Sequence, residues 1–442
     1  MSVDEAIATA LAGPHAIKNR EDAPVSNLSN AVLVLTAAFD SHTYFAYDQM
    51  ACEALLLLPI PGTMEADTEA ATFRPRPLTD VDVYELQVFL QRHLLTTLSA
   101  ETTHQAVEVL AKRHAFHPVR QYLEGLEWDG TERLGRWLTY HMGAEDTPYA
   151  QGIGRMFLIA MIARVFEPGC KADYMMVLEG PQGMGKSTAC AILGGDWFTD
   201  SLPDLQTGKE VSQHLRGRWL VEVPEMHALS TAENSALKSF LTRQAERYRP
   251  PFGRREVTEP RQCVFVGTHN QSTYLHDETG GRRYWPVRVT SIDIDGLRRE
   301  RDQLFAEAVN AYQQGERWWP EGDWEAEHIK PQQADRYVTD PWHDVIAIHL
   351  NGKEAGHRYT TAPEVAQSVI GMETSRVSQR EIKRVVAILR QLGWEYRRDA
   401  LARYWAHPAE AIPPTGLQEA RKKAAPAKKA EEVAPTHQGS WL

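Results

Sequence analysis

Residues 174–193 read YMMVLEGPQGMGKSTACAIL, and this stretch decides the fold of the central part of the chain. Tyr174–Leu178 is a short apolar run typical of a buried parallel strand. Residues 180–187 then fit the pattern G-x-x-x-x-G-K-[ST] at every position. A strand, a glycine-rich loop and a helix in this order indicate a P-loop, whereas a chance glycine-rich turn before a helix is the ordinary alternative.

The spacing within this loop suits the phosphates of a nucleotide. Its glycines allow the backbone to wrap the β-phosphate with N–H groups inward, and the helix N-terminus that follows favours negative charge. Lys186 would contact the β- and γ-phosphate oxygens, and Ser187 would bind Mg²⁺. We therefore expect ATP and Mg²⁺ as ligands. The expected nucleotide-binding residues are Gly180, Gly183, Gly185, Lys186, Ser187 and Thr188.

An acidic strand is expected to complete this site. Trp219–Val223 has the pattern of a strand, carries Glu222 and is followed by Pro224 and Glu225. A nucleotide site needs acids at a strand tip to hold Mg²⁺ and to activate the attacking water. We assign Glu225 as the base and Glu222 as the outer Mg²⁺ ligand, although the two roles can be reversed. A surface strand with two solvated glutamates is the alternative.

Two further segments carry polar side chains suited to a γ-phosphate. Cys263–Val266 is an apolar strand pattern followed by Asn270, whose amide can orient the attacking water. Arg282 and Arg283 follow two glycines and precede a strand, which suits a guanidinium pair donated across a subunit interface to the transition-state charge. A surface turn with two solvated arginines is the alternative.

The order of these motifs resembles the virulence-associated protein E family over residues 115–290. The resemblance implies a P-loop ATPase similar to superfamily-three helicases of the AAA+ type. It further implies a ring-shaped oligomer, expected to be a hexamer, which acts on single-stranded or forked DNA in replication of a phage or mobile element. A separate primase or polymerase would fit as a partner. The matching segments are FHPVRQYLEGLEWDGTERL, GPQGMGKST, WLVEVPEM, ALKSFLTRQAERYRPPFGRR, VFVGTHN and TGGRRYWPV.

A basic stretch at residues 238–262 interrupts a chain whose net charge is −11. Arginines alternate there with Tyr248 and Phe252, as in surfaces that stack bases and pair phosphates. Pro250–Gly253 has turn chemistry, and in superfamily-three helicases a hairpin at this place enters the ring channel. A solvated or salt-bridging loop is the alternative. The candidate DNA-binding residues of this stretch are Lys238, Arg249, Arg254 and Arg255.

The C-terminal part carries start signals for three helices, followed by a hairpin at residues 394–406. This order resembles a winged helix, whose third helix can enter a major groove. Lys383 and Arg384 on that helix are therefore further DNA-binding candidates, and use of the same fold for packing or protein contact is the alternative. The start signals are Asp340-Pro341, Thr361 with Glu364, and Ser378 with Glu381.

Composition sets the remaining limits. The 442 residues are 43% hydrophobic and 24% charged, which is typical of a folded multidomain protein. Four scattered cysteines argue against a structural zinc site and an oxidising compartment. Neither a signal peptide nor an apolar run long enough for a bilayer is visible. We therefore expect a protein of the bacterial host cytoplasm without membrane contact.

The expected fold class is an α/β P-loop NTPase core, AAA+/superfamily-three-like, with a small α+β N-terminal domain and a C-terminal winged-helix-like domain. Residues 321–338 read as a polar connector. Asp80 and Asp82 superficially resemble a polymerase carboxylate pair, but helix capping explains them better. The expected divisions are a flexible N-terminus at 1–25, the α+β domain at 26–118, the ATPase with its helical lead-in at 119–325, the winged-helix-like domain at 336–407, and a disordered Ala/Lys/Pro-rich tail at 408–442.

Three functions fit these patterns. The favoured one is an ATP-driven DNA helicase or translocase. A non-translocating AAA+ switch, such as a loader or a defence ATPase, would bind protein partners in place of DNA. A small-molecule kinase could use the same loop, but it would need neither the arginine turn nor the basic stretch.

Overall fold

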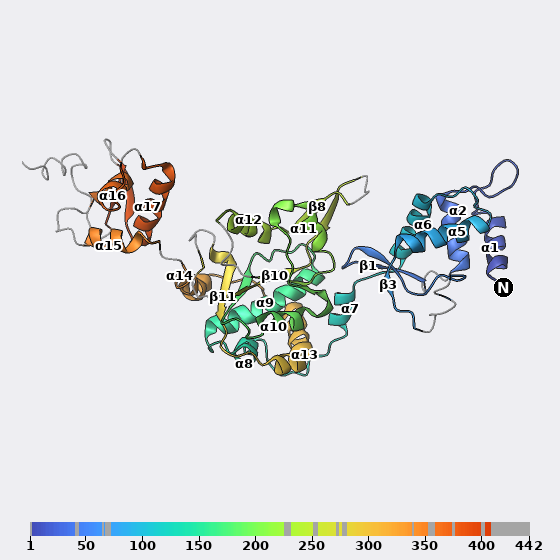
Figure 1. Cartoon of the computed structure of the whole chain (residues 1–442). Helices are drawn as coiled ribbons and strands as arrows, with labels where there is room; N and C mark the ends of the chain where they lie inside the picture. Colours follow the sequence, from blue (N-terminus) through green and yellow to red (C-terminus); the bar gives the residue numbers. More distant parts are fainter. Residues whose placement is uncertain are drawn as a thin grey trace, which may run out of the picture. The chain divides into compact units, whose positions relative to one another are not determined.

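The computed structural model divides the chain into two compact units, Met1–Tyr337 and Val338–Leu442 (Figure 1). The expected tail at 408–442, Glu225 and Arg254 lie outside the described residues. The structure describes residues 2–39, 44–63, 66, 72–224, 231–250, 255–270, 274–275, 281–337, 340–351, 359–373, 376–398 and 403–407.

The N-terminal part of the first unit packs helices against a small mixed sheet with strand order β3-β2-β1-β4. It has its own hydrophobic cluster, which includes Leu35, Phe45, Leu86 and Leu110. An α+β arrangement was expected for this part. Its elements are α1 (Val3–Ala12), α2 (Leu28–Ala38), β1 (Phe45–Asp48), β2 (Glu53–Leu56), β3 (Arg76–Pro77), α5 (Asp80–Arg92), α6 (Ala100–Arg113) and β4 (Ala115–Phe116).

The prediction of a flexible segment at residues 1–25 is wrong for its first half, where the chain forms α1. A capping box between Ser2 and Glu5 begins this helix. Ile7 and Leu11, one turn apart, are buried and fix it to the rest of the unit. Both signals are present in the sequence, because S-x-x-E followed by apolar residues at i and i+4 indicates a helix start.

Helix capping is confirmed as the role of Asp82. Its carboxylate accepts hydrogen bonds from the Thr79 backbone N–H at 2.7 Å and from the Arg76 guanidinium at 2.7 and 2.9 Å. Burial alone would raise the pKa of Asp82, but the hydrogen bonds from Arg76 and Thr79 outweigh it and lower that pKa. This carboxylate is therefore committed to the helix start.

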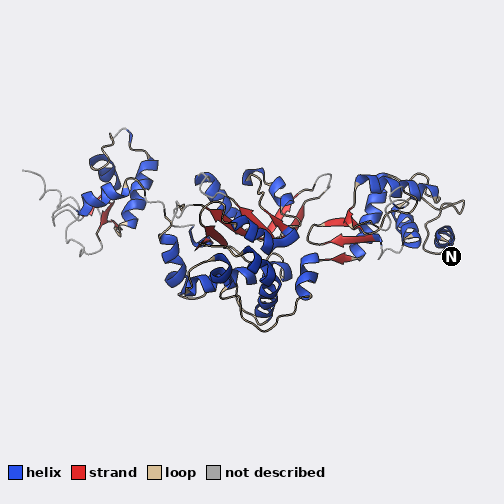
Figure 2. Cartoon of the chain, turned by 60° about the horizontal axis from the view of Figure 1, so that its bottom comes forward, coloured by secondary structure: helices blue, strands red, loops and turns tan. Residues whose placement is uncertain are grey.

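The central part of the first unit is a five-stranded parallel sheet with the order β11-β5-β10-β7-β6 (Figure 2). The connection after β5 passes β10 and β7 to reach β6, whereas the connection after β10 passes β5 in the opposite direction to reach β11. Open parallel sheets bind ligands at the carboxyl ends of strands where the connections diverge in this way. The strands are β5 (Met175–Glu179), β6 (Phe198–Thr199), β7 (Leu220–Val223), β10 (Val264–His269) and β11 (Tyr284–Arg288).

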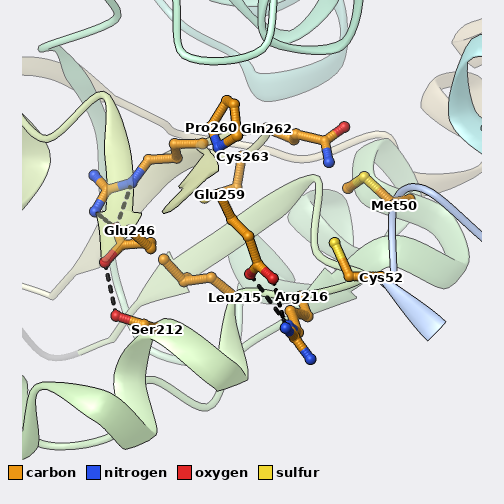
Figure 3. A pocket seen from close by; sticks show the side chains of 11 residues that line it. Met50, Cys52, Ser212, Leu215, Arg216, Glu246, Glu259, Pro260, Gln262 and Cys263 are labelled. Atoms are coloured by element: carbon orange, nitrogen blue, oxygen red, sulfur yellow. Dashed lines mark hydrogen bonds and ion pairs between the residues drawn. The ribbon is translucent and has the colours of Figure 1, made fainter. Parts of the chain in front are cut away.

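An antiparallel hairpin, β8 (Ala245–Tyr248) and β9 (Val257–Pro260), projects from this core. A hydrogen bond joins the base of the hairpin to the turn after β1, where Gln262 Nε2 donates to Gln49 O at 3.1 Å. Gly217, in the turn before β7, donates from its N–H to Met50 O at 2.9 Å. Figure 3 shows Met50 and Cys52 beside the hairpin base.

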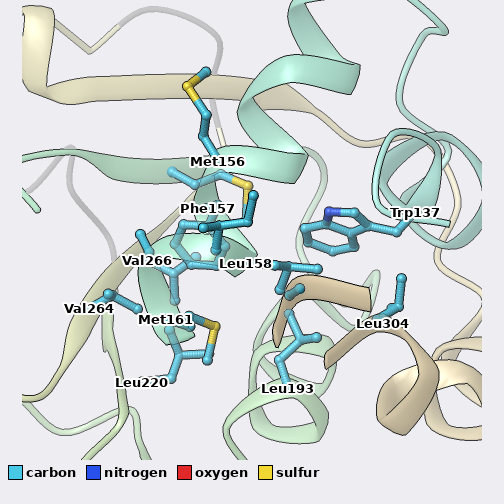
Figure 4. Close-up of a cluster of buried hydrophobic side chains, with 14 of the residues drawn as sticks. Trp137, Met156, Phe157, Leu158, Met161, Leu193, Leu220, Val264, Val266 and Leu304 are labelled. Atoms are coloured by element: carbon cyan, nitrogen blue, oxygen red, sulfur yellow. The ribbon is translucent and has the colours of Figure 1, made fainter. Parts of the chain in front are cut away.

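The hydrophobic core lies between the sheet and its helices (Figure 4). Met161 of α9, Leu193 of α10, Leu220 of β7 and Leu304 of α13 meet there and are fully or almost fully buried. Helix α9 is long and apolar enough to cross a membrane by length and composition, but 78% of its most apolar window is buried in the protein, which is typical of a core helix. The helices are α7 (Pro118–Glu124), α8 (Trp137–Met142), α9 (Pro148–Phe166), α10 (Lys186–Gly194), α11 (Lys209–His214), α12 (Thr231–Leu241), α13 (Ile294–Gln313) and α14 (Lys330–Ala334).

Residues 321–337, which were expected to form a polar connector, pack against the central part instead. A π-helical turn, Glu325–Ile329, leads directly into α14. Ile329 is fully buried. The Trp324 indole lies so close to Gly152 that a Cβ there would be 2.4 Å from the ring. The apolar residues of this segment are too few for a helical period, so the sequence pattern misses its packing.

In the described residues of the second unit, three helices accompany a three-stranded antiparallel sheet with the order β12-β14-β13. The predicted capping boxes at Thr361 and Ser378 are confirmed, and each begins a helix. Val385, Ile388 and Trp405 belong to the core between the helices and the sheet. The elements are α15 (His343–Asn351), β12 (Tyr359–Thr360), α16 (Ala362–Ser368), α17 (Gln379–Gln391), β13 (Glu395–Arg398) and β14 (Arg403–Ala406).

Candidate functional site

A cleft of about 390 Å³ opens at the carboxyl ends of β5, β7 and β10. The loop after β5, the last residues of β7 and the tip of β10 form its walls, so the predicted phosphate loop, acidic strand and Asn270 strand meet there. The lining residues are Gln182, Gly183, Met184, Gly185, Lys186, Ser187, Thr188, Glu222, Pro224, Thr268 and Asn270.

Glycine is required at three positions of this loop. Gly183 and Gly185 have φ angles of 82° and 89°, which side-chain-bearing residues rarely adopt. Gly180 does not have a positive φ, but a Cβ there would lie 2.8 Å from the carbonyl oxygen of Val289. Gly185 also begins α10 without a side-chain cap, so the first N–H groups of that helix face the cleft without competition.

Lys186 points across the loop. Its Nζ donates to Gly180 O at 2.6 Å, Pro181 O at 2.9 Å and Asn270 Oδ1 at 3.2 Å. Burial lowers the pKa of Lys186, and the negative charge of Glu222 opposes the shift. The three acceptors are uncharged, so an anion that enters the cleft would attract this ammonium more strongly than they do.

Glu222 is the buried acid of the site, with 1% of its surface exposed. Its Oε1 accepts hydrogen bonds from Ser187 Oγ at 2.7 Å and from Thr268 Oγ1 at 2.6 Å. Its Oε2 is buried and has no hydrogen-bond partner among the described residues. A buried carboxylate oxygen without a donor requires a cation or a water molecule.

Mg²⁺ fits this arrangement. The ion prefers a few carboxylate and hydroxyl oxygens together with phosphate oxygens and water. Ser187 Oγ and Glu222 are already 2.7 Å apart and face the loop that would hold the phosphates. These two residues would hold the ion, which would neutralise phosphate charge when bound.

The remaining predicted members of the site have different positions. Asn270 lies at the tip of β10 and accepts from Lys186, whereas His269 is buried and stacks on Tyr274 with ring centroids 4.4 Å apart. Glu225 lies outside the described residues. Thr268 is a further member of the site that the motifs do not single out; the available signal was a hydroxyl at the end of an apolar strand, two residues before Asn270.

Arg282 and Arg283 lie far from the cleft of their own chain. They form a turn, Gly281–Arg283, directly before β11. In the parallel register Tyr284 pairs with Met175 and Arg288 with Glu179. The arginines therefore lie at the amino ends of the strands and the cleft at the carboxyl ends, about 13 Å away along the strands at ~3.3 Å per residue.

Tyr248 and Arg261, at the base of the hairpin, show that part of the prediction of a basic surface at residues 238–262 is wrong. Tyr248 is 5% exposed, and its hydroxyl donates to Glu259 at 2.8 Å, so it is no surface platform for bases. Arg261 is 2% exposed; its Nε donates to Glu246 at 3.0 Å and its Nη1 to Phe240 O at 2.6 Å. Figure 3 shows Glu246 with dashed lines to its ion-pair partner and to Ser212. The net charge of the stretch therefore overstates its surface charge.

The DNA-binding candidates differ in what they contact. Arg249 and Arg255 are exposed on the two arms of the hairpin, and Lys238 is half-buried on α12. Lys383 is exposed on α17. Arg384 of that helix, in contrast, donates from Nη2 to Asp340 Oδ1 at 2.7 Å and lies 3.7 Å over the Trp342 ring. These contacts hold the guanidinium within the second unit, and its role as a DNA contact stays a prediction.

Known structures of the NrS-1 C-terminal region are similar to this chain at low identity. One apo structure in the A form has a TM-score of 0.40 and 11% identity over 82% of this chain and 96% of that chain. A second A-form structure has a TM-score of 0.39 and 13% identity over 64% and 77%. A third has a TM-score of 0.35 and 11% identity over 82% and 95%. No curated protein matches.

The family model of the virulence-associated protein E-like domain matches residues 123–338. The match includes every residue that lines the cleft, as well as the arginine turn and the hairpin. The resemblance predicted from the motifs is thereby confirmed. This central part of the chain, which holds the candidate site, therefore matches the virulence-associated protein E-like domain.

Proposed function

We propose that this protein is an ATP-dependent DNA helicase or translocase that works as a ring oligomer in the replication of a phage or mobile element. One observation carries the enzymatic part of the proposal. The cleft joins a lysine with uncharged partners, a serine hydroxyl and a buried acid with a bare oxygen. These are the groups needed to bind a Mg²⁺–nucleotide complex and stabilise phosphoryl transfer.

In this mechanism the chain's own residues bind and orient the nucleotide. The loop N–H groups and Lys186 would hold the β- and γ-phosphates, and Ser187 and Glu222 would hold Mg²⁺, which neutralises charge on the transferred phosphoryl group. Asn270 would orient the attacking water, and Glu225 would accept its proton. P-loop architecture of the AAA+ type is part of this proposal.

The position of Arg282 and Arg283 supports assembly of several subunits. Because they lie at the opposite ends of the strands from the cleft, they cannot reach a phosphate bound in their own chain. They can serve a neighbouring cleft if subunits associate head to tail, which is also how a closed ring forms. The exposed hairpin arginines would then contact DNA.

A subunit-mixing experiment tests this proposal. Arg282→Ala/Arg283→Ala protein keeps its cleft, whereas Lys186→Ala protein keeps its arginines, and each alone should be nearly inactive. A mixture of the two should recover ATPase activity, because some interfaces combine an intact cleft with an intact arginine pair. No recovery despite co-assembly, measured by mass, would contradict donation between subunits.

Unwinding of forked DNA by the wild-type protein distinguishes the helicase from its rivals. ATPase activity that DNA does not stimulate would favour a switch that binds protein partners. Activity of a monomer, independent of protein concentration, would favour a kinase. The expected result is DNA-stimulated hydrolysis together with strand separation.

A further inference from the structure

The segment 329–337 connects the two ends of the sheet, and we call it the strap. It contains Ile329, helix α14 and residues 335–337. Helix α14 packs against β11 and the arginine turn. None of these residues belongs to the predicted site, yet the side chains of the strap make buried polar contacts at both ends of the sheet.

At the nucleotide end, Arg336 holds Glu179. Glu179 is the last residue of β5, directly before Gly180, and is 3% exposed. Arg336 donates from Nε to Oε1 and from Nη2 to Oε2, each at 3.0 Å. A guanidinium paired with both oxygens of a carboxylate fixes its orientation as well as its distance. Arg336 therefore fixes the position from which the phosphate loop starts.

The backbone of Arg336 extends this connection to the tip of β10. Its carbonyl oxygen accepts from the N–H groups of Tyr274 and Leu275, each at 3.0 Å. Tyr274 stacks on His269, and the carbonyl oxygen of His269 accepts from Gly180 N at 3.0 Å. The strap is thus connected to the phosphate loop and to the strand tip that carries Asn270.

At the arginine end, Gln333 holds the beginning of β11. Gln333 is 4% exposed, and its Nε2 donates to the carbonyl oxygen of Tyr284 at 2.8 Å. Tyr284 directly follows Arg283, and its hydroxyl donates to Asn234 of α12 at 3.2 Å. The amide of Gln333 therefore contributes to the position of the arginine turn.

We propose that the strap is a positioning element for ATP hydrolysis at two clefts. Arg336 positions the phosphate loop of its own chain, and Gln333 positions the arginines that this chain offers to the cleft of a neighbouring subunit. The proposal rests on the proposed function, because the arginines need a neighbouring cleft. Gln333 and Arg336 are three residues apart, about one helical turn. A displacement of the loop by a bound nucleotide would thus reach the arginine turn through one short segment.

The subunit mixture separates the two roles. Gln333→Met keeps the side-chain volume but removes the amide donor, and Arg336→Lys keeps the charge opposite Glu179 but loses the paired geometry. Each variant is placed either on the Lys186→Ala subunit, which donates arginines, or on the Arg282→Ala/Arg283→Ala subunit, which donates the cleft. Gln314→Met, at the exposed end of α13, is the matched control.

Each variant is expected to reduce activity in only one of its two placements. Gln333→Met on the arginine donor should lower the recovered kcat about fivefold, the value of one neutral hydrogen bond. Arg336→Lys on the cleft donor should raise the KM for ATP about fivefold or more, because the hydrogen bond to Glu179 that is lost joins two charged groups. In the opposite placements both should stay within about twofold of the unmodified mixture, as should the control in either placement.

Three results would overturn the strap proposal. Equal losses in both placements, together with a lower unfolding temperature, would mean that the strap only stabilises the fold. Full activity in all placements would mean that it positions nothing. No recovery in the unmodified mixture would refute donation between subunits and the strap proposal with it, so failure of the proposed function is recognised before either variant is added.

Discussion

Charged side chains of the same kinds behave differently at the nucleotide cleft and at the base of the hairpin. Among the described residues, Lys186 of the cleft contacts only uncharged acceptors, and one oxygen of Glu222 has no partner. At the hairpin base, Arg261 pairs with Glu246 and Arg216 with Glu259. Ion pairs whose charges neutralise each other stabilise the fold. A lysine and a glutamate that lie close together without pairing indicate instead a site for a charged ligand.

Among the variants that test the contrast between the cleft and the hairpin base, Lys186→Ala is expected to have the largest effect on ATP hydrolysis. Lys186 is the one cation among the described residues that line the cleft. Its loss should lower kcat for ATP hydrolysis by roughly 10³-fold, because no other group replaces the charge at the phosphates. Lys209→Ala, at an exposed position at the start of α11, is the control. A Lys186→Ala protein that keeps a tenth of the wild-type rate would refute the nucleotide site.

Glu222→Gln should have the next largest effect. The amide cannot replace a carboxylate oxygen toward Mg²⁺, so turnover should fall on the order of 100-fold and need more Mg²⁺ for half its maximum. Glu225→Gln should keep the Mg²⁺ dependence and ATP binding but lose turnover. If Glu222→Gln traps ATP with unchanged Mg²⁺ dependence, the two acids have exchanged roles. A Mg²⁺ titration of ATPase activity and of nucleotide binding measures both.

The same comparison explains what the sequence could predict. Two loop glycines, Lys186 and Ser187 line the cleft within one short segment, from the loop after β5 to the start of α10, so a local pattern is sufficient to predict that they lie together. Arg261 could not be assigned in this way, because its role depends on Glu246, which the hairpin brings opposite it. In general, a run of basic residues states how much charge is present but not which part of it the fold neutralises.

The strap and Arg384 show that a local sequence pattern also cannot predict contacts between residues that lie far apart in the chain. The connector at 321–338 has a polar composition, yet Gln333 and Arg336 are engaged by Tyr284 and Glu179, which lie about 50 and 157 residues away in the sequence. The spacing of apolar and polar residues in this segment contains no information about such a pairing. Capping boxes are different, because both partners lie within four residues, and those at Thr361 and Ser378 were predicted correctly.

A smaller effect is expected at the hairpin. Replacing Arg254 and Arg255 by alanine should weaken binding to all single strands alike and reduce the slope of log affinity against log salt by roughly 1.4. Basal ATPase activity should remain, since Arg255 is not among the residues that line the cleft. Arg298→Ala/Arg299→Ala removes the same charge from α13 and is the matched control. An unchanged slope in the hairpin variant would move DNA contact elsewhere in the chain.

The smallest effect separates Lys383 from Arg384 in the second unit. Lys383 is exposed, so Lys383→Ala should lower the salt slope for duplex DNA by about 0.9 if α17 contacts phosphate. Arg384→Ala should leave that slope unchanged and instead destabilise the unit by about 1 kcal/mol, because it removes a partly exposed ion pair and a cation–π contact. Salt titrations and hydrogen exchange of α17 measure the two effects.

The pH dependence of the Arg384→Ala effect provides an independent check. Burial alone would raise the pKa of Asp340, but hydrogen bonds from Arg384 and from the Trp342 backbone outweigh it and lower that pKa. A carboxyl with a lowered pKa stabilises the fold above its unfolded pKa, and this contribution is lost as the pH falls through the folded value. The difference in stability between wild type and Arg384→Ala should therefore be constant near neutrality and narrow below about pH 4. Equal loss of salt slope in both variants, with no change in stability, would show that Arg384 leaves Asp340 to contact DNA.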